Sequence, residues 1–226
     1  MSVPHARKPE ADAPIRHASP GRPKDLAKGA AILEAAKRMF TLHGYERVSM
    51  DQIAAEAGVS KLTVYSHFGD KDALFAAAVK SHCDTQLPDT LFEASPDTPL
   101  RERLLTIAHA FFAMVSSPEA IAGHRIMCTP QITSSPLPAL FWTAGPQRVQ
   151  SAFAALLQRR VEAGELEIPD LAMASSQFFA LLKGEVHARM VFGCCSEGRS
   201  VEDHLTACVD MFLRAYGPRE SGNGKA

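Results

Sequence analysis

The stretch 49–74 constrains the fold of this chain more than any other part of it. Ser49, followed three residues later by Gln52, forms a capping box that satisfies two backbone donors at the start of a helix. Gly58 ends that helix, because the left-handed position after a helix favours a residue without Cβ. Ser60 then caps another helix. The pattern predicts two short helices joined by a three-residue turn.

The spacing within this stretch predicts how the two helices cross. Gly58 follows Ala54 by four residues, and Val64 follows Gly58 by six. Ala54 is small where the helices would touch, and Val64 would hold the second helix down. Two helices crossing at about 90–120° need this arrangement, so we expect a helix-turn-helix over about 49–68.

The exposed part of the second helix carries a cation, hydroxyls and a phenol, with almost no acid. These side chains are Lys61, Leu62, Thr63, Tyr65, Ser66 and His67. In helix-turn-helix proteins the first residues of the second helix meet base edges in the major groove, while other groups hold phosphates. The composition of this helix therefore favours DNA binding.

The same residues carry a family resemblance. The run strongly resembles the signature of TetR/AcrR-type transcriptional regulators: Ile53-Ala54, Ala57-Gly58-Val59-Ser60, Thr63-x-Tyr65-x-His67-Phe68, Lys71 and Leu74. It covers about 27–79, and 177–184 (QFFALLKG) is more weakly similar to the AefR-like branch. The resemblance implies a homodimer, an inducer cavity in the body, and a helix from about residue 70 that connects head to body.

We expect the DNA contacts to divide between bases and backbone. The candidates for base edges are Lys61, Leu62, Thr63 and Ser66. The candidates for phosphates are Ser49, Tyr65, His67 and Lys71.

The fold class expected is all-α, with a three-helix DNA-binding head and a larger helical body for ligand binding and dimerisation. A first helix, about 26–43, completes the head at 25–70, and the regulatory body spans 71–217. Residues 1–24 and 218–226 have the composition of flexible tails. Apolar periodicity and breakers place the body helices at 70–87, 100–116, 118–128, 141–163, 171–192 and 201–216.

Charge and cysteine content exclude several classes of protein. A formal net charge of −1 argues for a local basic surface and against bulk non-specific nucleic-acid binding. Five cysteines without a Cys-x-x-Cys spacing indicate reduced thiols in the cytoplasm, and neither a disulfide framework nor a zinc site. We expect no metal, no cofactor, no secretion signal and no membrane partner. The most apolar segment, 171–195, is interrupted by charged and polar residues.

The N-terminal tail ends in a basic element. Arg22 and Lys24 flank Pro23 just before the first helix. One interpretation is an arm that reaches a flanking groove or phosphate. The other is a simple disordered tail.

The last two helices are the expected dimer element, because one recognition helix reads only a few base pairs and two half-sites need two copies. Two copies would form a four-helix isologous interface. The expected contacts are Leu171, Phe178, Leu182, Val186, Met190, Leu205, Val209 and Phe212. The alternative is that these residues form only intramolecular core.

The middle of the body is rich in aromatic residues and methionine, which suit a flat, hydrophobic effector. The pocket candidates are Phe111, Phe112, Met114, Met127, Trp142, Phe178, His124 and Gln177. For each of them plain core or surface is the competing interpretation. Cys128, Cys194 and Cys195 are candidates for oxidant sensing, against the simpler reading of small buried or edge residues.

These observations predict a dimeric repressor that binds a palindromic double-stranded operator and is released by a small hydrophobic effector. An activator of the same fold stays open. A helical carrier or an enzyme would lack specific DNA binding, and the sequence shows no nucleophile triad, metal-spaced ligands or phosphate loop.

Overall fold

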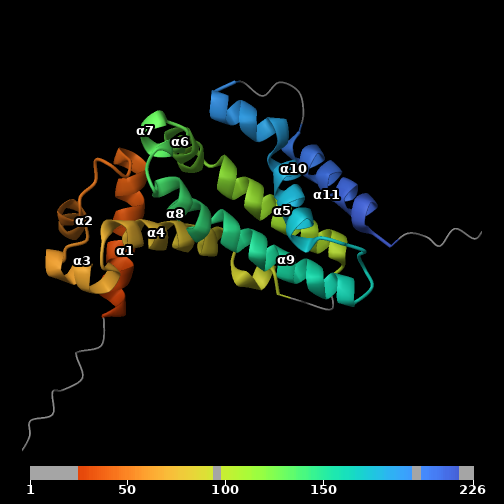
Figure 1. Ribbon diagram of the computed structural model, residues 1–226, viewed down its shortest axis with the longest axis horizontal. Coiled ribbons are helices and arrows are strands. Elements are labelled where there is room, and N and C mark those ends of the chain that lie inside the picture. Colours follow the sequence, from red (N-terminus) through yellow and green to blue (C-terminus); the bar gives the residue numbers. More distant parts are fainter. Residues whose placement is uncertain (1–24, 94–97, 195–199, 219–226) are drawn as a thin grey trace, which may run out of the picture.

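A computed structural model describes residues 25–93, 98–194 and 200–218. The described residues form helices and turns and contain no strand, which confirms the all-α prediction. Figure 1 shows α1, α2 and α3 as a small head at one end of the molecule and a larger helical body beyond it. The elements in chain order are α1 (Leu26–His43), α2 (Met50–Glu56), α3 (Lys61–Phe68), α4 (Lys71–Gln86), the 3-10 turn η1 (Asp89–Leu91), α5 (Leu100–Ser116), α6 (Pro118–Met127), α7 (Pro130–Thr133), α8 (Leu137–Ala144), α9 (Pro146–Glu162), α10 (Leu171–Phe192) and α11 (Val201–Tyr216).

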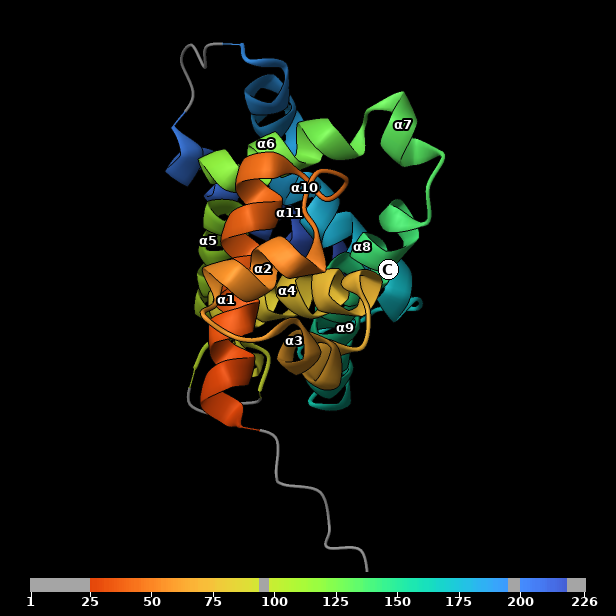
Figure 2. The same cartoon turned by 90° about the vertical axis from the view of Figure 1, so that its left-hand side faces the viewer.

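The head is held together by one apolar cluster that α1 to α4 share. Ile32, Ile53 and Val64, from α1, α2 and α3, are each fully buried. The cluster continues into α4 through Leu74, Phe75 and Ala78, and into the body through Ile132 and Leu137. Side chains on both sides of residue 70 therefore belong to one core. Figure 2 views this end directly, with α1, α2 and α3 in front of the body.

The connecting helix α4 belongs to both cores. Its first half packs in the head, while Cys83 and the following Leu87 are buried in the body cluster. Among its neighbours are α1 on the head side and α8 on the body side. Helix α4 therefore connects the core of the head to the core of the body.

Phenylalanine rings fill the centre of the body. Phe153 and Phe178 stack with ring centroids 4.6 Å apart, and Phe179 and Phe212 contact Phe178 edge-on. Phe153 and Phe178 have no exposed surface. Burying large apolar side chains in this way supplies most of the favourable free energy of folding for such a domain.

The expected single helix over 141–163 is two helices in the structure. The chain turns at Gly145, between α8 and α9, and Pro146 is the first residue of α9. Proline lacks the N–H that a continuous helix needs and disfavours helical geometry in the preceding residue. A Cβ on Gly145 would lie 3.0 Å from Val79 Cγ1 and 3.3 Å from Cys83 Sγ, so this corner packs tightly on α4.

Helix α10 contains a break that the sequence pattern did not indicate. Gly184 has φ 45° and ψ −153°, outside the helical region. Side chains of α11 donate to the carbonyls beside this break: His204 Nε2 lies 2.9 Å from the oxygen of Leu182, and Cys208 Sγ lies 3.3 Å from that of Leu181. Carbonyls released from the helix ladder thus receive partners from the neighbouring helix.

Within the described ranges, no single helix is long and apolar enough to cross a bilayer; only α5 and α6 taken together, bent by 65°, meet those criteria.

Candidate nucleic-acid interface

The turn between α2 and α3 is built by local hydrogen bonds. The Ser49 N–H donates to Gln52 Oε1 at 2.8 Å, and the Gln52 N–H donates to Ser49 Oγ at 3.2 Å, so the capping box is complete. Gly58 has φ +66°, a conformation that side chains with Cβ rarely adopt. Ser60 Oγ then accepts the N–H of Thr63 at 3.2 Å and caps α3.

Helix α3 turns Val64 inward and most of its polar residues outward. Val64 is fully buried, whereas Leu62 is 78% exposed and Tyr65 is 42% exposed. Lys61 and Ser66 are also exposed, whereas Thr63 is half-buried and its hydroxyl bonds to Ser60 Oγ. The helix thus offers one polar face with a protruding leucine. Figure 2 shows where α3 lies at this end of the molecule.

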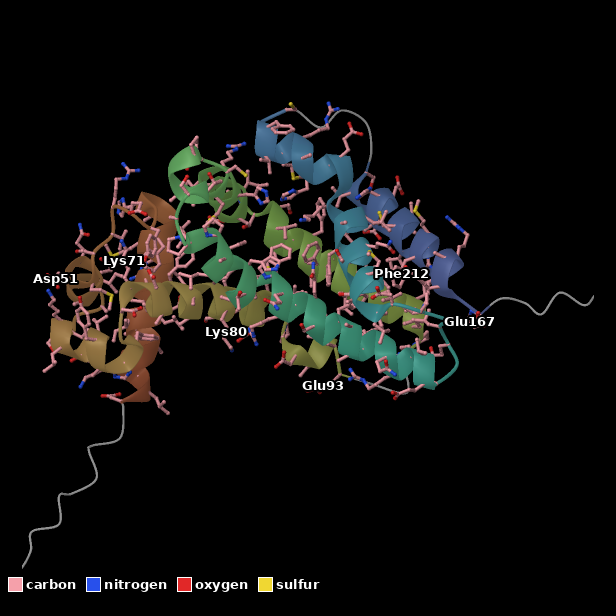
Figure 3. All side chains as sticks on the ribbon, in the orientation of Figure 1. Asp51, Lys71, Lys80, Glu93, Glu167 and Phe212 are labelled. Atoms are coloured by element: carbon pink, nitrogen blue, oxygen red, sulfur yellow. The ribbon has the colours of Figure 1, made fainter. Side chains whose placement is uncertain are left out.

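Lys61 is held by a carboxylate from the preceding helix. Its Nζ lies 2.9 Å from Asp51 Oδ1 and 3.0 Å from Oδ2, and the Tyr65 ring centroid is 5.9 Å away. The hydrogen bond that Lys61 donates to Asp51 raises the pKa of Lys61 above its ordinary value. Asp51 lies at the outer edge of the head (Figure 3). Asp51 was not among the residues expected at this site, because it lies on α2 and not on α3. The capping pattern of Ser49 and Gln52 places it on the first turn of α2.

Lys71 lies at the first position of α4, over the face of the Tyr45 ring at 4.1 Å from its centroid. The Tyr45 hydroxyl donates to Asp72 Oδ1. Burial, and then the bond to Asp72, raises the pKa of Tyr45, so the phenol keeps its proton. The Tyr45 ring, which is itself bonded to Asp72, thus lies under the ammonium group of Lys71 where the head joins α4.

His67 lies on the other flank of α3 and packs toward α1. A Cβ on Gly29 would lie 3.1 Å from His67 Nδ1, and the His67 ring contacts the Phe68 ring at 6.1 Å between centroids. The side chain is half-buried, and Ser49 is exposed. Arg22 and Lys24, the expected DNA arm, lie outside the described residues.

The expected ligand-pocket residues do not gather around one space. Phe111, Phe112, Met114 and Phe178 are buried in the body core, whereas Met127 packs against the head cluster. Three others face outward: Trp142, which is 52% exposed, His124, and Gln177, whose side chain accepts the Tyr216 hydroxyl at 2.6 Å. Apolar character alone did not distinguish core from surface here, because aromatic residues occur in both.

The expected dimer residues separate in a similar way. Five of them are at most 1% exposed within one chain and form its core: Phe178, Leu182, Leu205, Val209 and Phe212. Their side chains are therefore closed to a second copy. Leu171, Val186 and Met190 are half-buried against the same core. The exposed face of these two helices instead carries Met173, Ala180, Ala207 and Met211.

The thiols differ in their accessibility. Cys128 and Cys194 are exposed, whereas Cys83 and Cys208 are buried. Burial raises the pKa of the Cys83 thiol to about 11, which keeps it protonated at neutral pH. Cys195 lies outside the described residues. In the parts of the chain that the structure describes, no three metal-ligating side chains are grouped to hold an ion.

Two family models match this chain. Residues 32–78 match the description "Bacterial regulatory proteins, tetR family", and residues 102–218 match "AefR-like transcriptional repressor, C-terminal domain". The chain belongs to the TetR family. It is therefore a regulator of transcription with a DNA-binding helix-turn-helix, and not an enzyme. Both parts of the resemblance stated from the sequence are confirmed.

Individual TetR-family proteins agree with this assignment. The transcriptional regulator EthR of Mycolicibacterium smegmatis is 31% identical over 161 residues, which cover 69% of this chain and 71% of EthR. The activator FasR of the same organism is 32% identical over 105 residues, about half of each chain (46% and 47%). The structure of the flavonoid-responsive regulator FrrA is 29% identical, covers 87% of this chain and 100% of its own, and superposes with a TM-score of 0.68.

Proposed function

We propose that this chain is a dimeric repressor that binds a palindromic operator through α3. The observation that carries the proposal is the outward polar face of α3, held by the Gly58 turn and the buried Val64. Base edges would be read by Lys61, Leu62, Thr63 and Ser66. Phosphates would be held by Ser49, Tyr65, His67 and Lys71.

The dimer would form through the exposed face of α10 and α11. Met173 and Ala180 are spaced by seven residues along α10, and Ala207 and Met211 by four along α11, so each pair lies on one helix face. Met173 is 54% exposed and Met211 is 48% exposed. Helices α10 and α11 lie on the side of the body away from the head (Figure 1). Two-fold symmetry there would direct two heads to half-sites about 34–36 Å apart.

A small hydrophobic effector would act through α4, because this helix is shared by the two cores. FrrA is described as flavonoid-responsive, which supports a small-molecule effector for this chain as well. Useful control needs a coupling between effector and DNA sites of about 1–3 kcal/mol.

A mobility-shift assay with the DNA upstream of the chain's own gene tests the proposal. A specific shift that survives competitor DNA and has dimer stoichiometry is expected. Absence of a specific shift would refute the proposal and favour a ligand carrier whose head no longer binds DNA. Met211→Arg should halve the mass in light scattering, whereas Leu42→Arg, at an exposed position of the head, should leave the mass unchanged.

The second candidate is an activator, which FasR exemplifies among the similar proteins. A reporter gene behind the shifted DNA separates the two. Expression that falls when the protein is supplied supports repression, and expression that rises supports activation.

A further inference from the structure

An apolar groove runs along the outside of the molecule between α4 and α8. Its volume is about 520 Å³, within the range of about 300–1,000 Å³ usual for small-molecule sites. The lining residues are mostly small and apolar: Ala76, Ala77, Lys80, Pro136, Ala139, Leu140, Thr143, Ala144 and Arg148. The two helices lie side by side in Figure 1. Walls of this kind favour the binding of an apolar part of a ligand.

The groove also contains two cations that share one carboxylate. Lys80 Nζ lies 2.6 Å from Asp84 Oδ2, and Arg148 Nη1 lies 2.9 Å from Asp84 Oδ1. Lys80 and Arg148 both line the groove, whereas Asp84 is not part of its wall. One positive charge is therefore left in excess on the wall, and each cation has further N–H donors besides the one that Asp84 uses.

We propose that this groove binds an amphiphilic monocarboxylate, whose apolar body lies along α8 and whose carboxylate is received by Lys80 and Arg148. A single anionic head matches the excess charge. Arginine is also suited to receive a carboxylate through two parallel N–H bonds. The phenylalanine-filled interior, where the sequence analysis expected an effector, is separate from this site.

The place of the groove links binding to the head. The corner at Gly145 packs tightly on Val79 and Cys83 of α4. On the head side of this contact, Ala76 and Ala77 form the groove wall, next to Phe75 and Ala78 of the head core. A molecule between Ala77 and α8 would press α4 away from the body on the head side. This regulatory consequence rests on the proposed function, but the binding site itself does not.

Calorimetric titration of the full-length protein with decanoate, below its micelle concentration, tests the site. Decanol, which has the same apolar chain without the charge, is the comparison ligand. Decanoate should bind about tenfold more tightly than decanol. Arg148→Gln should weaken decanoate binding by about tenfold. Ala139→Asp, which places a carboxylate in the apolar wall, should weaken both ligands.

Arg101→Gln is the matched control. Arg101 also pairs with an aspartate at an exposed position, with Nε 2.8 Å from Asp210 Oδ1, but it lies outside the groove. This variant should bind decanoate like the unchanged chain. Equal affinities for decanoate and decanol, or an Arg148→Gln variant that binds decanoate as well as Arg101→Gln does, would overturn the assignment.

The mobility shift separates this result from the proposed function. Arg148-dependent decanoate binding without any operator shift would support the site and refute the proposed regulator. An operator shift without decanoate binding would support the regulator and refute the site.

Discussion

The Nζ of Lys61, the first residue of the recognition helix α3, lies 2.9 Å from Asp51 Oδ1 on α2. Both side chains are more than half exposed, so this ion pair contributes little to stability and is weakened by salt. Its consequence concerns binding. A phosphate that approaches Lys61 must compete with the Asp51 carboxylate for the ammonium group. A base edge can instead accept a hydrogen bond from a lysine N–H that Asp51 does not use. We therefore expect Asp51 to reduce binding to DNA of unrelated sequence.

Asp51→Asn should raise the affinity for random DNA more than the affinity for the operator. The slope of log binding constant against log salt concentration should also become steeper, by about the amount that one phosphate contact contributes. Fluorescence anisotropy over a salt series measures both. Glu56→Gln is the control: it removes the same charge from α2, but Glu56 pairs with Arg38 instead. Equal effects of the two substitutions would show that only net charge matters.

Lys61→Ala should weaken operator binding by roughly ten- to a hundredfold if the lysine holds a base, and should weaken random DNA much less. Anisotropy with both DNAs gives the two numbers. An equal loss for both would assign Lys61 a purely electrostatic role.

Gly58→Ala should destabilise the head by about 1–2 kcal/mol, because a residue with Cβ is strained at φ +66°. Open space surrounds this position, so the cost is conformational and not steric. Gly123→Ala makes the same chemical change inside α6, where it should stabilise by about 0.5–1 kcal/mol. Denaturant unfolding compares the two; the same sign for both would contradict the backbone argument.

Phe153→Ala should cost about 3–5 kcal/mol, because its ring is fully buried among other aromatic rings. Trp142→Ala, at a side chain that is 52% exposed, should cost far less. Urea unfolding monitored by far-UV circular dichroism measures both free energies. A small loss at Phe153 would mean that the ring borders a space and is not tightly packed.

Stability should fall as pH drops below about 6.5, because burial lowers the pKa of His187 and the nearby His124 and Lys183 lower it further. The unfolded histidine, with a pKa near 6.5, takes up its proton before the folded one does, so protonation favours unfolding. The contribution of neutral His187 to stability is therefore fully present above about pH 6.5. It is lost progressively as the pH falls from about 6.5 to the lower pKa of the folded state.

Thermal unfolding between pH 7.5 and 5.5 checks this expectation. The decline should be shallower in His187→Asn. A residual slope is also expected, because burial likewise lowers the pKa of His82 and of His124. A variant with an undiminished slope would exclude His187 as a source of the pH dependence.

The helices and turns of the head could be predicted from local sequence signals. Ser49 with Gln52, Gly58 and Ser60 are capping and turn signals that act within a few residues, so they hold wherever the segment is placed. The family signature lies on the same local pattern, and the fold class follows from helical periodicity along the whole chain.

The packing of the helices was needed to see which apolar residues of the body face inward and which charged side chains pair with each other. Phe178 and Phe212 are core although both were expected at the dimer interface, and Trp142 is exposed although it is the largest apolar side chain. The pairing of Asp51 with Lys61, the groove between α4 and α8, and the bond from His204 to Leu182 join segments whose separation in the chain carries no periodic signal. Such contacts depend on how helices cross, which packing of the complete chain determines.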